Sequence, residues 1–383
     1  MALSKDFGFG PDEQMVRDQA RRFLADHVPV DRLRAMVARD HHEAYETDVQ
    51  PASWDERLWR QMVELGWTAL GVPESAGGLG MKPIVGVALA EEIGRVALPS
   101  PLPATMLATA VLRAASASSW LERIAGGESA TLAVTPESGS WEPGETGVEA
   151  RAAAGGAVLS GRAAFVQDAR KCRLLVVAAR GAAGVGLWVV PADAPGVTIV
   201  PDRIVDLTRD QATVVLESVR VEQARVAAPE GKGEQALAQA LPTILALLAA
   251  DLCGAAEWQL QTTAEYARTR VQFERPIGFF QSVKHPLVNV MLAIDRARSL
   301  TYAAACALDE DPADALRLAR MAKAAASDAG AFASDRSVQL HGGIGFTWES
   351  DVHIWFKRQK HTEQLFGNAV HQRARLADLL DAA

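Results

Sequence analysis

Segment 270–285 of the chain, RVQFERPIGFFQSVKH, is the most informative part of the sequence. It offers an arginine, an aromatic ring and an amide, namely Arg270, Phe273 and Gln281. Taken alone, these residues suit a bound ligand and a capped helix end equally well, with a proline that stops the helix and a glycine that turns the chain. A second signal has to decide between these two interpretations.

Segment 339–349, QLHGGIGFTWE, is the second candidate for a ligand contact. Glycines such as Gly342 and Gly343 let a backbone approach a ligand closely, although glycines are also common at the C-terminal ends of helices. The segment does not follow a predicted strand, so it is not a dinucleotide fingerprint of the strand–turn–helix kind.

Four histidines in the last part of the chain are candidates for acid–base catalysis or metal binding. His341 alone is more simply a packed residue. His353, His361 and His371 are spaced by eight and ten residues, which does not place them on one helical face. No cysteine or clustered carboxylate completes a ligand shell, so we predict no metal site.

The composition indicates a globular protein. The 383 residues are 49% hydrophobic, which is enough for a sizeable core and for two or three domains. The net charge is −8 and the basic residues are scattered, which argues against nucleic-acid binding. Cys172, Cys253 and Cys306 have no paired spacing, and we expect reduced core residues. We recognise neither a targeting segment nor a membrane span, and expect the cytoplasm.

Hydrophobic periodicity divides the chain into three parts. Helical spacing dominates from Pro11 to about Gly127, and short apolar runs typical of an antiparallel β domain follow. Alanine-rich helical stretches separated by Pro276, Pro286 and Pro312 then favour a four-helix bundle. These stretches are 236–264, 287–308, 312–340 and 362–380. The predicted domains are 1–128, 129–230 and 231–383.

Two segments resemble the flavin-contacting motifs of the acyl-CoA dehydrogenase family, namely 270–285 and 339–349. They occur in this order and within this helical–β–helical pattern. Segments 71–80 (GVPESAGGLG) and 90–95 (AEEIGR) resemble its N-terminal helical signatures. Four matches in register extend the resemblance over nearly the whole chain. It implies an α+β fold with an N-terminal helical domain, a central antiparallel β domain and a C-terminal four-helix bundle.

By this resemblance, the two motifs would hold the diphosphate and adenosine part of FAD. An arginine can bond diphosphate oxygens bidentately, and an aromatic face can stack on a purine. Gln339 and Gly343 would reach the cofactor from a neighbouring subunit. Glu274 stands where the family usually has glycine, and its carboxylate would repel a diphosphate unless it turned away. The implied cofactor residues are Arg270, Phe273, Gln281, Gln339, Gly342 and Gly343.

The resemblance also implies a cradle for the flavin ring in the β domain. Its counterparts here are Thr135, Phe165 and Gln167. Segment 140–146 replaces a small turn of the family, and Gln167 replaces the hydroxyl that usually bonds the flavin edge. We therefore expect this subunit's own β domain to hold a flavin ring poorly.

The family reaction removes the α-proton of an acyl-CoA thioester while Cβ delivers a hydride to the flavin, which requires a carboxylate base. The two positions that carry this base in the family correspond here to Phe366 and Ile244, and neither can accept a proton. Asp251 is the nearest acid on the same helix, two turns or ~10 Å from Ile244. It is either an unusual base or an acid bonded to a neighbouring helix.

Three hypotheses follow from the resemblance. The first is an active, homo-oligomeric FAD-dependent acyl-CoA dehydrogenase of lipid metabolism, a dimer or tetramer with Asp251 as the base. The second is a subunit that depends on a related subunit for the base, as in heteromeric bacterial members of the family. The third is another flavin-dependent oxidation. In the first two, acyl-CoA is the substrate and an electron-transfer partner reoxidises the flavin. We favour the second.

Overall fold

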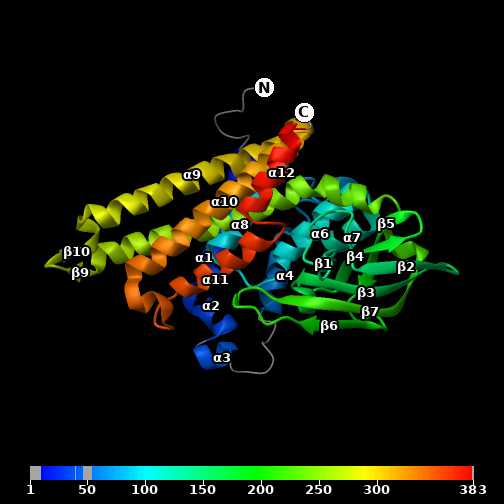
Figure 1. Cartoon of the computed structure of the whole chain (residues 1–383), viewed down its shortest axis with the longest axis horizontal. Coiled ribbons are helices and arrows are strands. Elements are labelled where there is room, and N and C mark those ends of the chain that lie inside the picture. The colour runs from blue at the N-terminus through cyan, green and yellow to red at the C-terminus, as the bar shows by residue number, and fades with distance from the viewer. Residues whose placement is uncertain (1–9, 39, 46–53, 382–383) are drawn as a thin grey trace.

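The computed structural model describes residues 10–38, 40–45 and 54–381. The first nine residues, on which the prediction of no targeting segment partly rests, lie outside the described residues. Helices form the part up to residue 125, strands the part from 130 to 228, and helices the part from 233 onward (Figure 1). The predicted α+β fold is confirmed.

The N-terminal part is a group of helices around the apolar pair α5 and α6. Asp55 caps α4 by accepting hydrogen bonds from the backbone N–H groups of Arg57 and Leu58. Most residues of α5 and α6 are buried, as expected for helices that are apolar on nearly every face. The helices are α1 (Pro11–His27), α2 (Val30–Val37), α3 (His41–Tyr45), α4 (Glu56–Glu64), α5 (Pro83–Arg95), α6 (Leu102–Ala114) and α7 (Ser118–Ala125).

The central sheet has the order β6-β7-β3-β2-β4-β5-β8, with β1 paired to β4. The prediction of a purely antiparallel domain is wrong in this detail, because β4 pairs in parallel with both β1 and β2. Between β2 and β4 the chain runs back along β3, so β4 enters the sheet in the same direction as β1 and β2. The strands are β1 (Ala130–Ala133), β2 (Val148–Ala153), β3 (Gly156–Gln167), β4 (Leu174–Gly181), β5 (Gly184–Pro191), β6 (Val197–Pro201), β7 (Gln211–Glu222) and β8 (Val226–Ala228).

Both faces of the sheet are covered around β4. Leu174, Val176 and Ala178 join a large core shared with the N-terminal helices and the bundle. The alternating neighbours, including Leu175 and Val177, pack into a second core on the opposite face. The period of two residues in a strand explains this division.

The C-terminal part is built on three long helices, α8 (Gly233–Thr269), α9 (Gln281–Glu310) and α10 (Pro312–His341), which pack against one another. A short hairpin of β9 (Val271–Gln272) and β10 (Arg275–Pro276) joins α8 to α9. Figure 1 shows this hairpin at the end of the molecule opposite the sheet.

Two expectations about these helices are wrong. Pro286 does not separate helices but lies within α9, close enough to its start that only one early backbone hydrogen bond is lost. The predicted helix 362–380 is interrupted, because α11 (Val352–Gln364) ends before α12 (Ala369–Asp381) begins. The turn between α11 and α12 carries Phe366.

Helix α8 corrects the statement that no stretch is long and apolar enough to cross a membrane. It passes that test by length and composition, but 83% of its most apolar window is buried inside the protein. Leu245 and Leu252 on this helix are fully covered by neighbouring elements. We therefore describe α8 as the central core helix of the fold.

Candidate functional site

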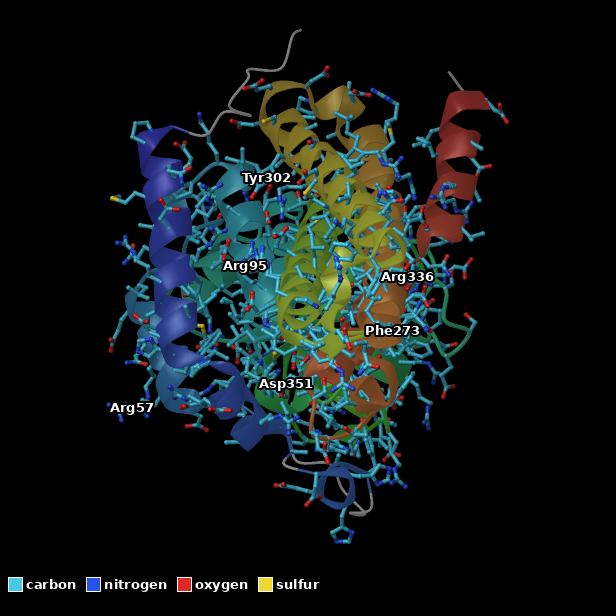
Figure 2. All side chains as sticks on the ribbon, turned by 90° about the vertical axis from the view of Figure 1, so that its left-hand side faces the viewer. Arg57, Arg95, Phe273, Tyr302, Arg336 and Asp351 are labelled. Atoms are coloured by element: carbon cyan, nitrogen blue, oxygen red, sulfur yellow. The ribbon has the colours of Figure 1, made fainter. Side chains whose placement is uncertain are left out.

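The hairpin end of the bundle presents the first motif to solvent. Arg270 ends α8, Gln281 begins α9, and both are exposed. Phe273 is 86% exposed, and Figure 2 looks onto this end of the molecule. Phe273 and Glu274 both have left-handed backbone conformations, with φ of 52° and 62°. A glycine would adopt this conformation at Glu274 with less strain, which explains why glycine suits the position.

The second motif lies beside the first. The ring of Tyr266, one turn before the end of α8, stacks on His341 with centroids 4.2 Å apart. After His341, Gly342 has φ of 65°, and a Cβ added at Gly342 or Gly343 would meet no atom within 4 Å. The exposed Gln339 lies on the last turn of α10. The two motifs therefore form one open surface that a ligand can reach.

His341 has a packing role at this surface. It is buried, its Nδ1 lies 2.8 Å from the main-chain oxygen of Ser337, and burial lowers its pKa. The imidazole is therefore neutral at neutral pH and donates to Ser337. Within residues 10–38, 40–45 and 54–381, no group of three histidine, cysteine or acidic residues could hold a metal ion. The three cysteines are buried, as predicted, and none forms a disulfide with another described cysteine.

The other end of the molecule contains the predicted flavin cradle, and there the polar groups already bond one another. The Nε2 hydrogens of Gln167 donate to the main-chain oxygen of Phe165 at 3.0 Å and to Gln211 Oε1 at 2.9 Å. Its Oε1 accepts from His361 Nε2 at 2.7 Å, and desolvation lowers the pKa of His361 to about 4. Gln167 therefore has no free donor for a flavin edge.

Thr135 and Phe165 have the residue types that the family cradle has, but Trp141 of segment 140–146 lies in the same cavity. Thr135 is buried, and its backbone pairs with Ala164. Trp141 and Phe366 line the same cavity as Thr135 and Phe165. Segment 140–146, which differs from the family's small turn, therefore brings an indole into the place where the cradle is expected.

Trp141 stacks on Phe366, and this pair lines two neighbouring cavities, one shared with Phe165 and one shared with Ile244. Their ring centroids are 4.7 Å apart, with an angle of 29° between the planes. Phe366 has a left-handed backbone with φ of 54°, and Gly367 follows with φ of 88°. These two residues turn the chain sharply between α11 and α12 and direct the phenyl ring toward segment 140–146.

The two family base positions converge on one cavity. Ile244 of α8 and Phe366 both line a space of about 340 Å³ beside Trp141. The carboxylate in this wall belongs to Glu142, which the sequence analysis did not identify. Arg375 Nη2 lies 2.5 Å from Glu142 Oε1, so the carboxylate is already paired.

A buried lysine holds the turn that carries Phe366. The Nζ atom of Lys323 donates to the main-chain oxygens of Glu363 at 2.9 Å and Gly367 at 3.0 Å, and to Ser327 Oγ at 3.3 Å. Its side chain is fully buried, and desolvation lowers its pKa to about 7. Lys323 was not predicted, because a lysine in an alanine-rich helix gives no signal of burial.

Asp251, the sequence candidate for an unusual base, is buried in an ion-pair cluster. Its carboxylate accepts from Arg358 Nη2 at 2.6 Å and from Arg209 Nη2 at 2.9 Å. Thr362 Oγ1 lies 3.5 Å from its other oxygen. The cluster joins α8 to α11 and to the loop before β7, and both carboxylate oxygens are occupied.

Comparisons with known proteins agree with this architecture. The family model "Acyl-CoA dehydrogenase, N-terminal domain" matches residues 10–128, and "Acyl-CoA dehydrogenase, C-terminal domain" matches residues 231–380. Acyl-CoA dehydrogenase IpdE2 of Mycobacterium tuberculosis is 32% identical over 360 residues, which covers 93% of each protein. The chain belongs to the acyl-CoA dehydrogenase family. Members of this family are FAD-dependent oxidoreductases.

Two similar solved structures come from assemblies of two differently named chains. A chain of the ChsE4-ChsE5 complex from Mycobacterium tuberculosis has a TM-score of 0.85 and 26% identity, covering 99% of each chain. A variant of the Tcur3481-Tcur3483 steroid ACAD has a TM-score of 0.83 and 30% identity, covering 97% of this chain and 98% of that one. The predicted likeness to subunits of heteromeric members is thus confirmed.

The hairpin end and the sheet end of the molecule differ in how well their residues fit FAD. At the hairpin end, an exposed arginine, an exposed aromatic ring and unobstructed glycines suit the diphosphate and adenosine. At the sheet end, the internally bonded Gln167 and the Trp141–Phe366 stack do not suit a flavin ring. This chain's residues therefore fit one end of the cofactor.

Proposed function

We propose that this chain is the non-catalytic subunit of a heteromeric acyl-CoA dehydrogenase. It supplies adenosine-side contacts to an FAD whose flavin ring is held by a related partner subunit, and the partner supplies the base. The pair oxidises an acyl-CoA thioester in the cytoplasm and passes electrons to an electron-transfer protein.

The observation that carries this proposal is the cavity shared by Ile244 and Phe366. In the family reaction a carboxylate at one of these positions takes the α-proton. Here both side chains are hydrocarbon, and Trp141 packs on the second of them. Neither side chain can accept a proton, which supports abstraction of the α-proton by another chain.

The separation of the two ends supports a shared site. Arg270 and Gly343 lie at the hairpin end, whereas Thr135 and Gln167 lie in the sheet region (Figure 1). A second chain has to bring its own sheet region to the hairpin to complete a cofactor site. Closed assembly of two chains is the usual way to meet this requirement.

The chain's own residues then have defined tasks. Arg270 would donate to diphosphate oxygens, and Phe273 would stack on the adenine and shield it from water. Gln281 and Gln339 add donors around the same surface. When bound, FAD supplies the hydride acceptor. Asp251 in this proposal ties α8 to α11, since two guanidinium groups already occupy its carboxylate.

One observation favours an alternative, an active homo-oligomer. Glu142 lines the cavity of Ile244 and Phe366 and would reach a substrate if it left Arg375 and if Trp141 moved aside. Under this alternative Glu142 or Asp251 would be the base. The Glu142→Gln and Asp251→Asn variants separate the alternative from the proposal.

The test compares the chain purified alone with the chain co-expressed with a related subunit that carries a glutamate at the base position. Flavin absorbance and acyl-CoA oxidation with an artificial electron acceptor are measured for both. We expect the lone chain to be colourless and inactive, and the co-expressed pair to be yellow and active. Turnover by the lone chain that is lost in Glu142→Gln or Asp251→Asn would refute the proposal.

A further inference from the structure

The tip of the β9–β10 hairpin combines backbone strain with exposure to solvent. Gln272 pairs with Arg275, so the loop between the two strands consists of Phe273 and Glu274. Two-residue loops in which both residues have positive φ usually contain glycine, asparagine or aspartate. Here a phenylalanine and a glutamate adopt these angles, with φ of 52° and 62°, and both side chains are exposed. Positive φ at a bulky residue is rare and costs stability.

The base of the hairpin is held in place, so the strain at the tip is not released there. The N–H of Ile277 donates to the main-chain oxygen of Arg270 at 2.8 Å and closes the hairpin. The guanidinium of Arg275 lies 4.4 Å from the ring centroid of Phe279, which is a cation–π contact. Arg275, the neighbour of Glu274 in the sequence, therefore already has a partner within the hairpin end.

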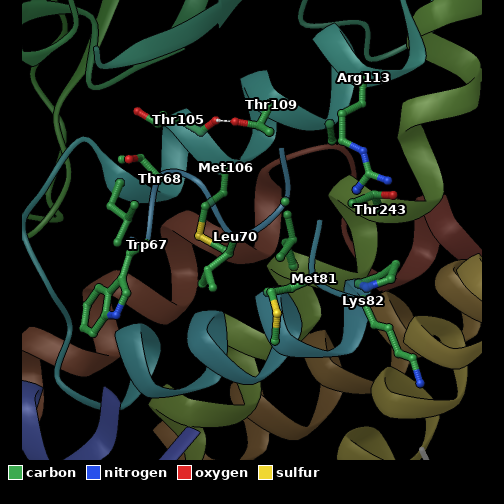
Figure 3. Close-up of a pocket in the computed structure, with 16 residues that line it drawn as sticks. Trp67, Thr68, Leu70, Met81, Lys82, Thr105, Met106, Thr109, Arg113 and Thr243 are labelled. Carbon is green, nitrogen blue, oxygen red and sulfur yellow. Dashed lines mark hydrogen bonds between the residues drawn. The ribbon is translucent and has the colours of Figure 1, made fainter. Parts of the chain in front are cut away.

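The carboxylate of Glu274 has no ion pair or hydrogen bond with another described residue. An unpaired exposed charge is ordinary by itself. Arg113 is also exposed without an ion pair among the described residues, but it lies in the regular helix α6, where its backbone is not strained (Figure 3). Glu274 differs because a glycine at the same place would avoid the cost of its backbone conformation. Such strain points to a contact that the side chain makes.

We propose that Glu274 binds a basic side chain, arginine or lysine, of the related partner subunit. This inference rests on the proposed function, in which Arg270 contacts the diphosphate of a shared FAD. A carboxylate on the same hairpin as a diphosphate site repels the ligand unless a cation lies beside it. Arg270 serves the diphosphate and Arg275 packs on Phe279, so the cation comes from the other chain.

A second copy of this chain is a poorer partner for Glu274. The surface that a partner brings to the hairpin in the proposed pair is its sheet region. In this chain, the arginines beside segment 135–146 of that region are already paired, Arg162 with Glu137 at 2.8 Å and Arg375 with Glu142 at 2.5 Å. The contact therefore favours a subunit of different sequence, which is a form of specificity by charge.

The test measures how tightly the full chain binds a related subunit that carries a glutamate at the base position, by biolayer interferometry with excess FAD. Glu274→Gln should weaken binding about tenfold, because it removes a charge-assisted contact. The difference from wild type should shrink at high salt, which screens an exposed charge pair. Glu265→Gln is the matched control: Glu265 is an exposed acid of α8 that pairs with Arg268 of the same helix, and its loss should leave binding unchanged.

Glycine at position 274 should have opposite effects on the lone chain and on the pair. Glu274→Gly relieves the strained backbone, so the lone chain should unfold at a higher urea concentration than wild type. The same variant lacks the carboxylate and should bind the related subunit about tenfold more weakly. Glu274→Ala separates the two effects, because it removes the charge and keeps the strain: it should weaken binding without stabilising the lone chain.

Three outcomes would overturn the inference. Equal binding by wild type and Glu274→Gln would show that the carboxylate has no partner, and tighter binding by Glu274→Gln would show that it only repels the diphosphate. A lone chain that Glu274→Gly does not stabilise would remove the strain on which the inference is built. A wild-type chain that does not bind the related subunit at all would contradict the proposed function, and this inference with it.

Discussion

The hairpin end and the sheet end of this chain have opposite characters. At the hairpin end, Arg270 and Phe273 are exposed and the glycines beside Gln339 leave open space. At the sheet end, the Trp141–Phe366 stack and the hydrogen bonds of Gln167 leave the polar and aromatic groups with partners inside the chain. The side chains of the hairpin end are thus free to contact another molecule, whereas those of the sheet end contact one another.

This contrast explains how a chain can keep cofactor motifs and still lack the catalytic carboxylate. In the proposed pair both chains have to retain their contacts across the shared site, and Arg270 would contact a cofactor that the partner mainly holds. If the partner supplies the base, position 366 of this chain has no catalytic role. An aromatic pair then stabilises the fold at that position better than a buried carboxylate would.

The largest expected effect is at the hairpin end. Arg270→Ala should lower the FAD affinity of the co-expressed pair about a hundredfold, since two charge-assisted hydrogen bonds are lost. Flavin content after gel filtration measures the change. Arg268→Ala is the control, because Arg268 is exposed nearby and, among the described residues, its ion pair is with Glu265 of the same helix. Equal flavin loss in both variants would contradict a specific role of Arg270.

At the sheet end, Phe366→Glu should destabilise the chain by about 3 kcal/mol, because it places a charge against the indole of Trp141. Urea unfolding measures the change. Val370→Glu is the control: Val370 is 74% exposed at the start of α12, and its substitution should change stability by less than about 0.5 kcal/mol. A Phe366→Glu chain as stable as wild type would show that the stack does not stabilise the sheet end.

The buried Lys323 predicts a pH dependence. Its pKa is about 7 in the folded chain and near the ordinary value when unfolded, so the unfolded chain binds more protons between these values. Stability should therefore rise with pH from about 7 to about 10, by up to about 1.4 kcal/mol per pH unit from this group. In Lys323→Met this part of the slope should disappear. Parallel stability–pH curves for the two proteins would rule out a neutral buried lysine.

The smallest effect concerns Gln167. Gln167→Ala removes hydrogen bonds to Phe165, Gln211 and His361 and should cost about 1–2 kcal/mol without changing the flavin content of the pair. Gln261→Ala, on an exposed face of α8, should cost less than about 0.5 kcal/mol. Loss of flavin in Gln167→Ala would show that this amide binds the cofactor after all.

The sequence predicted features that depend on local pattern. The valine-rich runs of β4 and β5 and the order of helices and strands follow from periodicity. The absence of a base at Phe366 stays a prediction from the family motif. Strand β2, VEARAA, has too few apolar residues to be recognised, because its conformation depends on pairing with β3. The roles of Trp141 and Lys323 depend on packing between distant segments, which no local pattern encodes.

The number of flavins in the purified pair tests the central claim most directly. In the proposed pair, the hairpin end of this chain and the sheet region of the partner together form one cofactor site. The account therefore predicts one FAD for each pair of chains. The sheet end of this chain should remain without flavin even when FAD is in excess. Two FAD molecules per pair, counted from flavin absorbance against protein concentration, would contradict the account.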